Sequence, residues 1–358
     1  MRIILSLFLF LSLNLYGQTI KHRLILLGDA GEINEGQRLS IQKASELIIA
    51  EQTSVYFLGD NIYPLGMGLD SANASEGQQI LQSQFAPFTT KSAAVTFIAG
   101  NHDWDKSGKL GLEKVRAQEA YLNSKGIASL TYLPKAGTAE IAVVNPTNAT
   151  KLLLYDSEYW LFPNHQNADS ALSEKVRTNF LSNLKSELTQ NPASRMLIIS
   201  HHPMISFGEH GKNITWKDHI FPLTRKWKNL YLPLPILGSL YPLIRTKIFY
   251  SAEDLTHPIY QKLKADITTL TAAHKDVVFI AGHDHGLQLI QDNTITQIVT
   301  GSGSKTSHIA HHHSQRFVSN HQGFCVLDIL SNEDIAITFY TVDKGKVTKA
   351  FESILPKK

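Results

Sequence analysis

Short apolar runs alternate with longer amphipathic segments along the first third of the chain. The runs at 23–27, 55–58 and 94–99 are typical of β-strands, and a glycine directly follows each of them. We expect helices at 35–51, 76–88 and 111–124. This β-α-β-α-β rhythm predicts parallel strands joined by crossover helices.

The pattern changes further along the chain. Short β-type runs lie near Tyr132, near Ile141 and at 152–155. A helix beginning after Asp169 is predicted, because apolar residues recur every four positions from there to residue 188. Strands are expected at 196–199 and 277–281, followed by a β-rich tail over 288–351. Since neither a repeat nor a clear linker is visible, we expect one domain over 19–358.

The N-terminus has the pattern of a secretory signal peptide. Arg2 precedes an apolar run from Ile3 to Leu15, which as a helix would span about 20 Å, too short for a bilayer core of about 30 Å. A positive start, a short apolar run and the small residue Gly17 predict a signal peptide over 1–18. The protein is therefore expected to be exported, either to a periplasm or out of the cell.

Residues 219–257 stand apart from the strand and helix pattern. The stretch from Asn229 to Ile244 is apolar but carries three prolines, which forbid a regular helix or central strand. We interpret it as an insertion packed on the domain. It is either an ordinary loop, a lid over the site, or a surface that touches a membrane or a partner protein.

Composition narrows the function classes. The chain of 358 residues is 43% hydrophobic and 18% charged, with a formal net charge of +3. This is typical of a globular protein, and no block of like charges indicates nucleic acid as a partner. Cys325 is the single cysteine, so no internal disulfide is expected, and its apolar surroundings in the sequence predict a buried, inert thiol.

Five short segments place metal-binding residue types directly after an apolar strand. Such strand ends gather at one edge of a sheet, and a glycine before four of them allows close approach of the backbone. The predicted ligands are Asp29, Asp60, Tyr63, Asn101, His201, His283 and His285. This mixed oxygen and nitrogen set suits iron, zinc or manganese better than calcium. One shared carboxylate would give four contacts to each of two metals, an arrangement suited to phosphoryl transfer.

These segments, in this order, resemble the purple acid phosphatase branch of the calcineurin-like metallophosphoesterases, close to its tartrate-resistant type. Most of that superfamily has a histidine two residues after the first aspartate, where this chain has Gly31, and here Gly59-Asp-Asn-Ile-Tyr63 supplies a tyrosine instead. The stretches 204–211 and 286–292 also match the branch. The resemblance covers roughly residues 23–302, is weakest over 104–195 and is absent across 219–257.

The resemblance implies an α+β, four-layer αββα sandwich of two mixed β-sheets flanked by helices. It implies Fe(III) at Asp29, Asp60, Tyr63 and His285, and a divalent Fe, Zn or Mn at Asp60, Asn101, His201 and His283. A metal-bound hydroxide would then hydrolyse a small phosphate monoester without a covalent enzyme intermediate. By the same resemblance, His102 would stabilise phosphoryl charge and His210 would give a proton to the leaving group.

Two other functions remain compatible with the sequence. The same metals could serve a phosphodiester or nucleotide substrate, or the chain could be a non-catalytic exported binding protein of the same fold. The cluster of His308, His311, His312 and His313 lies in a Gly/Ser-rich region and is interpreted as a solvated loop near the mouth of the site. Lys305 and His308 are the residues of this region that could touch substrate.

Overall fold

The structure is a computed structural model, which describes residues 18–162, 170–211, 220–221, 231–233, 255, 257–292 and 294–358. Residues 1–17 of the predicted signal peptide and most of the predicted insertion over 219–257 lie outside these residues. Within them, no helix is both long and apolar enough to cross a membrane.

One seven-stranded sheet combines the start and the end of the chain. Its order is β14-β13-β12-β1-β2-β3-β4. Its strands are β1 (Ile20–Leu27), β2 (Thr53–Leu58), β3 (Ala94–Ile98), β4 (Leu130–Tyr132), β12 (Gly323–Leu330), β13 (Ile335–Asp343) and β14 (Lys346–Leu355). Strands β1 to β4 are parallel, as their crossover helices predict, whereas β12 to β14 add antiparallel strands.

The second sheet is built from the middle of the chain, in the order β11-β9-β10-β8-β7-β6-β5. Its strands are β5 (Ala142–Thr147), β6 (Thr150–Leu154), β7 (Arg195–Ile199), β8 (Val277–Ala281), β9 (Leu287–Gln291), β10 (Thr296–Thr300) and β11 (Gln315–Ser319). Strands β6, β7, β8 and β10 are parallel, and antiparallel strands complete both edges. Both sheets are therefore mixed, as expected.

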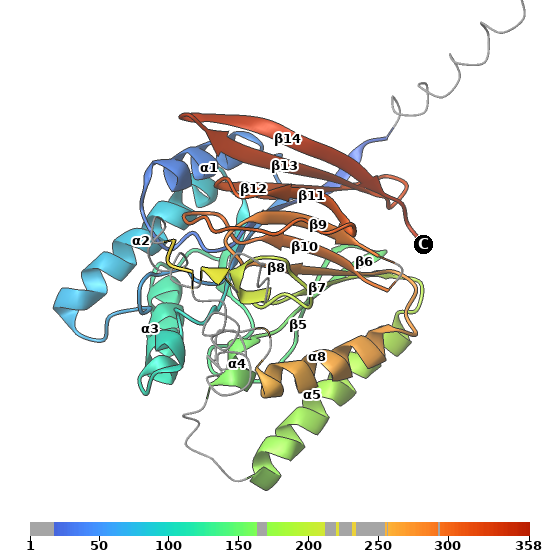
Figure 1. Cartoon of the computed structure of the whole chain (residues 1–358), viewed down its shortest axis with the longest axis horizontal. Coiled ribbons are helices and arrows are strands. Elements are labelled where there is room, and N and C mark those ends of the chain that lie inside the picture. Colours follow the sequence, from blue (N-terminus) through green and yellow to red (C-terminus); the bar gives the residue numbers. More distant parts are fainter. Residues whose placement is uncertain are drawn as a thin grey trace, which may run out of the picture.

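Helices cover the outer face of each sheet (Figure 1). The first sheet carries α1 (Glu35–Glu46), α2 (Ser71–Thr89) and α3 (Gly111–Ser124), and the second carries α4 (Glu158–Leu161), α5 (Ser170–Gln190) and α8 (Pro258–Thr271). In β1, Leu24 and Leu26 face the other sheet, while Ile25 and Leu27 face the helices. A strand buried on both faces must be apolar throughout, which explains the continuous runs in the sequence. The predicted four-layer sandwich is confirmed.

Helix α1 is shorter than predicted. It begins after the cap Asn34, whose side chain accepts a hydrogen bond from the amide of Gln37, and it ends at Glu46 rather than at residue 51. Thr53 Oγ1 accepts from the amide of Ile49 and donates to its carbonyl, so this side chain takes over the backbone partners that another helical turn would supply.

Strand β1 lies in the middle of its sheet because β12 pairs with its other edge. Residues 20–27 run antiparallel to 323–330, and Leu26 lies opposite Cys325. Cys325 is fully buried, and burial raises the pKa of its thiol well above the usual value. The prediction that Cys325 is buried is confirmed, and its inertness stays a prediction.

Candidate metal centre

The carboxyl ends of β1, β2 and β3 in one sheet and of β7 and β8 in the other meet at one place. The loops that follow them carry all seven residues that the sequence analysis singled out: Asp29, Asp60, Tyr63, Asn101, His201, His283 and His285. The structure therefore brings the five segments together. Most of these side chains are buried, with His285 partly open to solvent.

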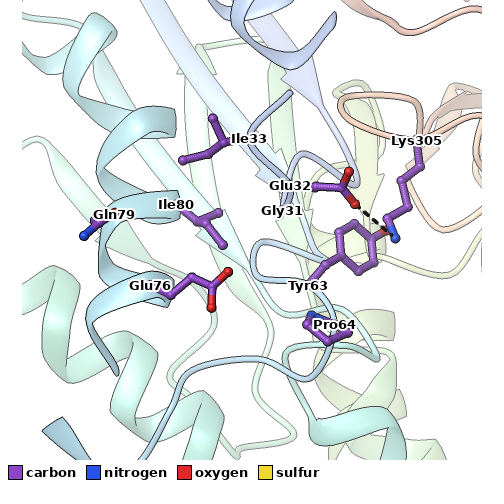
Figure 2. Close-up of a pocket in the computed structure, with 9 residues that line it drawn as sticks. All are labelled: Gly31, Glu32, Ile33, Tyr63, Pro64, Glu76, Gln79, Ile80 and Lys305. Atoms are coloured by element: carbon purple, nitrogen blue, oxygen red, sulfur yellow. Dashed lines mark ion pairs between the residues drawn. The ribbon is translucent and has the colours of Figure 1, made fainter. Parts of the chain in front are cut away.

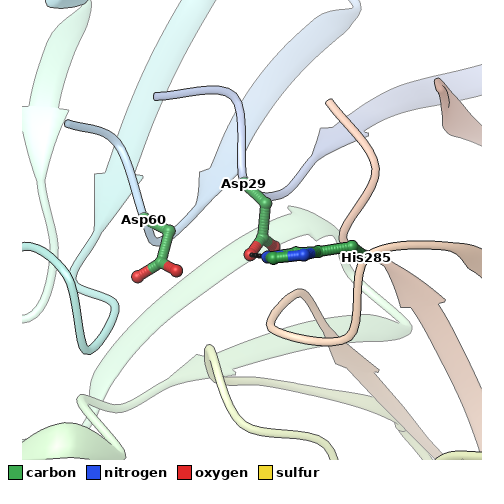
Figure 3. A group of neighbouring side chains, drawn as sticks. All are labelled: Asp29, Asp60 and His285. Carbon is green, nitrogen blue, oxygen red and sulfur yellow. Dashed lines mark ion pairs between the residues drawn. The ribbon is translucent and has the colours of Figure 1, made fainter. Parts of the chain in front are cut away.

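A first group of donor atoms surrounds the phenol oxygen of Tyr63. It lies 3.0 Å from Oδ1 of Asp29, 3.1 Å from Oδ2 of Asp60 and 3.2 Å from Nε2 of His285. Figure 3 shows that Asp29, Asp60 and His285 come from three separate loops, and one ligand atom of each lies within 4.8 Å of those of the other two. Among the described residues, these three form a group of acidic and histidine side chains that could hold an ion.

A second group surrounds Oδ1 of Asn101. This oxygen lies 3.0 Å from Nε2 of His201 and 3.1 Å from Nδ1 of His283, and the two ring nitrogens are 3.2 Å apart. Nε2 of His201 is also 3.3 Å from Oδ1 of Asp60. Asp60 thus belongs to both groups, with Oδ2 beside Tyr63 and Oδ1 beside His201.

The spacing of these atoms fits metal ions. Iron and zinc bind nitrogen and oxygen donors at about 2.0–2.2 Å. Two donors at that distance lie about 3.0 Å apart when they are at right angles and about 3.4 Å apart at the tetrahedral angle. The separations within both groups run from 3.0 to 3.4 Å. The chemistry and spacing of the donors therefore fit two cations.

The backbone is strained at three of the candidate ligands. Asp29, Asp60 and His283 have positive φ values of 56°, 53° and 71°, which L-residues with side chains rarely adopt. Gly59, just before Asp60, makes this turn possible, because its φ is 85° and an added Cβ would lie 2.5 Å from Nδ1 of His201. Strain of this kind persists where the surroundings enforce it, often at functional sites.

Hydrogen bonds orient the candidate ligands. Nδ1 of His201 lies 2.7 Å from the carbonyl oxygen of Leu58, and because a carbonyl only accepts, Nδ1 carries the proton and Nε2 is left to bind a cation. Oδ2 of Asp29 accepts from the amide of His283 at 2.7 Å. Asp103, which the sequence suggests as a supporting partner of His102, instead accepts hydrogen bonds from the amides of Gly100 and Asn61.

The protonation of the site follows from its concentration of charge. Burial favours the neutral acid of Asp60, but the charges of His201 and His102 hold its pKa well below the usual range. Burial, reinforced by the carboxylates of Asp29 and Asp60, raises the pKa of Tyr63 well above its usual 10.0. Burial opposes the charged form of His201 and His285, yet the neighbouring carboxylates outweigh it and raise the pKa of both rings. The protons of Tyr63, His201 and His285 thus lie where the candidate cations would bind.

His102 and His210 both face a cavity of about 190 Å³ at this site, which is lined by Asp60, Asn101, His102, Lys106, His210, His283, His285 and Lys305. Nδ1 of His102 lies 2.6 Å from the carbonyl oxygen of Pro64, so it carries the proton. The other ring nitrogen, Nε2, is 3.8 Å from Oδ2 of Asp60. The sequence analysis did not single out Lys106, because nothing in the sequence separates it from other lysines.

The ring of His210 lies against that of His283, with centroids 4.2 Å apart. Its backbone amide donates to Oδ1 of the buried Asp284, between the two ligand candidates His283 and His285. Asp284 therefore fixes the position of the segment that carries His210. His102 and His210 thus line the same cavity, and their contact with a substrate stays a prediction.

A second cavity of about 380 Å³ adjoins the first (Figure 2). Lys305 and Tyr63 line it, and Lys305 also lines the first cavity. The ammonium of Lys305 lies 3.9 Å from the centre of the Tyr63 ring and 3.5 Å from Oε2 of Glu32. Lys305 thus stands at the junction of the two cavities.

The four-histidine cluster has no comparable organisation. His308, His311, His312 and His313 are exposed, and the ring of His312 stacks on Phe207 at 4.4 Å. The interpretation as a solvated loop agrees with this exposure.

No protein-family model matches the chain. Purple acid phosphatase 3 of Arabidopsis thaliana is 21% identical over 332 residues, which are 88% of this chain and 72% of that protein. Glideosome-associated protein 50 of Plasmodium falciparum is 34% identical over 83 residues, which span 23% of this chain and only 21% of that protein's length.

Two solved structures resemble the whole fold. One is GAP50, described as the anchor in the inner membrane complex of Plasmodium, with a TM-score of 0.56, 18% identity and coverage of 94% of this chain and 89% of that chain. The other is purple acid phosphatase PPD1 from yellow lupin (Lupinus luteus) seeds, with a TM-score of 0.50, 12% identity and coverage of 94% and 54%. The chain therefore shares its fold with a purple acid phosphatase and with a Plasmodium anchor protein.

Proposed function

We propose that the protein is a dinuclear-metal phosphatase that hydrolyses phosphate monoesters. The observation that carries this proposal is the position of Asp60, whose two carboxylate oxygens each belong to a separate group of donor atoms. A single carboxylate shared in this way is suited to hold two cations side by side, and paired cations are suited to phosphoryl transfer.

The first site would consist of Asp29, Asp60, Tyr63 and His285, and the second of Asp60, Asn101, His201 and His283. A phenolate is a hard anionic ligand, so Fe(III) is proposed for the first site. The second site has no charged ligand besides Asp60, which suits divalent iron, zinc or manganese. When bound, the two cations supply charge that attracts phosphoryl oxygens and lower the pKa of water toward neutrality.

The chain itself would orient the substrate and move a proton. His102 is proposed to act as an imidazolium, which carries a proton on both ring nitrogens: Nδ1 donates to the carbonyl oxygen of Pro64, and Nε2, near Asp60 at the cavity, would donate a hydrogen bond to the phosphoryl group. His210, held by Asp284, lines the same cavity and is proposed to protonate the leaving oxygen.

Metal analysis combined with an activity assay tests the proposal. Purified protein should hold two metal ions per chain and hydrolyse p-nitrophenyl phosphate. Asn101→Ala should retain one ion, lose at least about a hundredfold in kcat/KM and still unfold cooperatively, because it removes a ligand from one site only. A protein that binds fewer than two ions, or an Asn101→Ala variant with unchanged activity, would contradict the proposal.

A non-catalytic role is the second candidate, favoured by the match to the Plasmodium anchor over nearly the whole of both chains. In that case bound metals would serve the stability of the fold alone. The two functions differ in one measurement: metal-loaded protein that is folded, holds two ions and hydrolyses neither a monoester nor a diester would support the anchoring role. A diesterase would instead turn over bis(p-nitrophenyl) phosphate at least as well as the monoester.

The remaining expectations stay as proposals about the whole chain. We propose that residues 1–18 direct export and that 19–358 form one catalytic domain. The segment 219–257, most of which lies outside the described residues, is proposed to be an ordinary packed loop, a lid over the site, or a surface that meets a membrane or partner. Comparing the mature N-terminus of the protein after expression with the printed sequence tests the first of these.

A further inference from the structure

The loop that carries Lys305 is tied to the loop that carries the candidate ligand Asp29. The amide and the hydroxyl of Ser304 both donate to the carbonyl oxygen of Asp29, at 2.9 and 2.6 Å. The carbonyl oxygen of Ser304 in turn accepts a hydrogen bond from Nδ2 of Asn34 at 2.7 Å. Ser304 is buried, so water does not compete for these bonds. The backbone beside Lys305 is therefore held in a fixed position relative to the first donor group.

The side chain of Lys305 is held by two contacts of its own. Its ammonium lies 3.9 Å from the centre of the Tyr63 ring and 3.5 Å from Oε2 of Glu32 (Figure 2). Only 33% of the side chain is exposed. An aromatic face and a carboxylate both attract an ammonium, so the two contacts together place the positive charge over the ring. Glu32 offsets part of this charge toward solvent.

The ring below the ammonium is itself fixed. The amide of Tyr63 donates to the carbonyl oxygen of Gly31 at 3.0 Å, and the ring of His102 packs edge-on against the Tyr63 ring, with centroids 4.4 Å apart. The phenol oxygen of Tyr63 belongs to the first donor group. One side chain thus presents its oxygen to the candidate metal and its face to Lys305. Negative charge on a phenolate oxygen spreads over the ring, where the ammonium can act on it.

We propose that Lys305 tunes the metal of the first site through the Tyr63 ring. The ammonium draws negative charge toward the face of the ring and away from the phenolate oxygen, which weakens the donation to Fe(III) and raises the reduction potential of the iron. This inference rests on the proposed function, because it needs the iron that the function places beside Tyr63. Lys305 acts through a ligand, as groups around metal sites do when they adjust a redox potential, so it is a positioning residue.

The test compares lysine variants of the full chain loaded with iron. Lys305→Met keeps most of the length of the side chain but removes the charge, and Lys305→Arg restores a cation that stacks on aromatic faces. Lys125→Met is the matched control, because the Lys125 ammonium lies 4.0 Å from the centre of the Tyr121 ring and neither residue lines the metal cavity. The absorption maximum and the reduction potential are measured without substrate.

Lys305→Met should move the absorption maximum to longer wavelength and lower the reduction potential, because a more electron-rich phenolate transfers charge to Fe(III) at lower energy. The ratio of the binding constants for Fe(III) and Fe(II) should rise about tenfold. Lys305→Arg should return both properties toward the wild type, and Lys125→Met should match it. Unchanged properties in Lys305→Met, or equal changes in Lys125→Met, would overturn the proposal. So would a Lys305→Met protein that binds no iron, because Lys305 would then have a structural role.

These measurements separate the inference from the proposed function, because neither of them needs hydrolysis. If the iron-loaded wild type shows the visible band and the variants show the expected shifts, but no ester is hydrolysed, the phosphatase assignment fails and the role of Lys305 stands. If the iron-loaded wild type shows no visible band, Tyr63 is not an iron ligand, and the role of Lys305 is wrong whatever the activity.

Discussion

The phenol oxygen of Tyr63 lies 3.0 Å from Oδ1 of Asp29, in a buried site where a neutral phenol satisfies the carboxylate by donating its proton. A trivalent cation between these oxygens would replace that proton, because it stabilises the phenolate far more than the neighbouring groups disfavour it. Because Tyr63 belongs to the first donor group, the visible absorption of the iron-loaded protein would report the oxidation state of the bound metal.

Tyr63→Phe should abolish the visible absorption of the iron-loaded protein, because the proposed charge transfer from phenolate to Fe(III) needs the phenol oxygen. Tyr132→Phe is the control, since Tyr132 is also a buried tyrosine but belongs to β4. Its spectrum should match that of the wild type. An absorption band that survives in Tyr63→Phe would show that Tyr63 is not an iron ligand.

Gly59→Ala should destabilise the protein and weaken metal binding. The added Cβ would lie 2.5 Å from Nδ1 of His201, and the residue would keep a φ of 85°. We expect a loss of about 2 kcal/mol in the free energy of unfolding, measured with urea, and a metal content below two ions per chain.

Gly126→Ala separates crowding from backbone strain in that experiment. Gly126 also has a positive φ, of 64°, but its Cβ would meet nothing within 4 Å. Gly126→Ala should therefore lower the free energy of unfolding only by the cost of the positive φ, and it should leave the metal content unchanged. If both variants lose the same amount of stability and of metal, contact with His201 is not what requires glycine at position 59.

Lys106→Gly should stabilise the protein, because Lys106 has a φ of 52°. Glycine adopts the left-handed region without the cost of about 1–2 kcal/mol that an L-residue carries. Glycine also makes the unfolded chain more flexible, and this lowers the gain in stability by about 0.4–1 kcal/mol. The net gain in unfolding free energy should reach about 1 kcal/mol. Lys109→Gly, at a position outside the left-handed region, should lose stability instead, and a loss in both variants would argue against strain at Lys106.

The Arg195–Asp276 ion pair should make the stability of the protein fall in acid. Nε of the buried Arg195 lies 2.9 Å from Oδ1 of Asp276, and although burial opposes the charge, this hydrogen bond holds the pKa of Asp276 below its usual 3.8. A carboxyl group with a depressed pKa in the folded state stabilises it above pH 3.8, and this contribution is lost as the pH falls below that value.

Asp276→Asn should therefore lower Tm at pH 7 and approach the wild type below about pH 3. The exposed Asp343, changed to Asn, serves as the control and should follow the wild type at every pH. The comparison needs only thermal melts over a pH series. A Tm difference between Asp276→Asn and the wild type that stays constant down to pH 2 would rule out this origin.

The strands and the strand-end residues could be predicted because both follow from local patterns. The run 23–27 has no polar residue after Arg23, and Gly28 and Asp29 follow it directly, so the position of the site at the strand end was evident. The range of α3 was predicted to the residue. The end of α1 was not, because it depends on a side-chain contact from Thr53.

Other features of the site depend on contacts between distant segments. The position of Asp60 between the two donor groups requires both sheets to be assembled, since Tyr63 follows β2 and His201 follows β7. The turn at Lys106 has a left-handed backbone that its residue types do not favour, and Lys114 and Glu158 hold it from outside. Residue propensities predict the opposite conformation there, so only the structure reveals Lys106 at the cavity.

The pairing of β1 with β12 constrains the order in which the protein can be assembled. Strand β1 is among the first parts of the described chain to leave the ribosome, yet one of its two edges stays unpaired until residues 323–330 have been made. Closing so long a loop is slow, and an apolar strand with an open edge invites association with other chains. Fragments that stop before residue 323 lack the strand that covers this edge, and we expect them to aggregate.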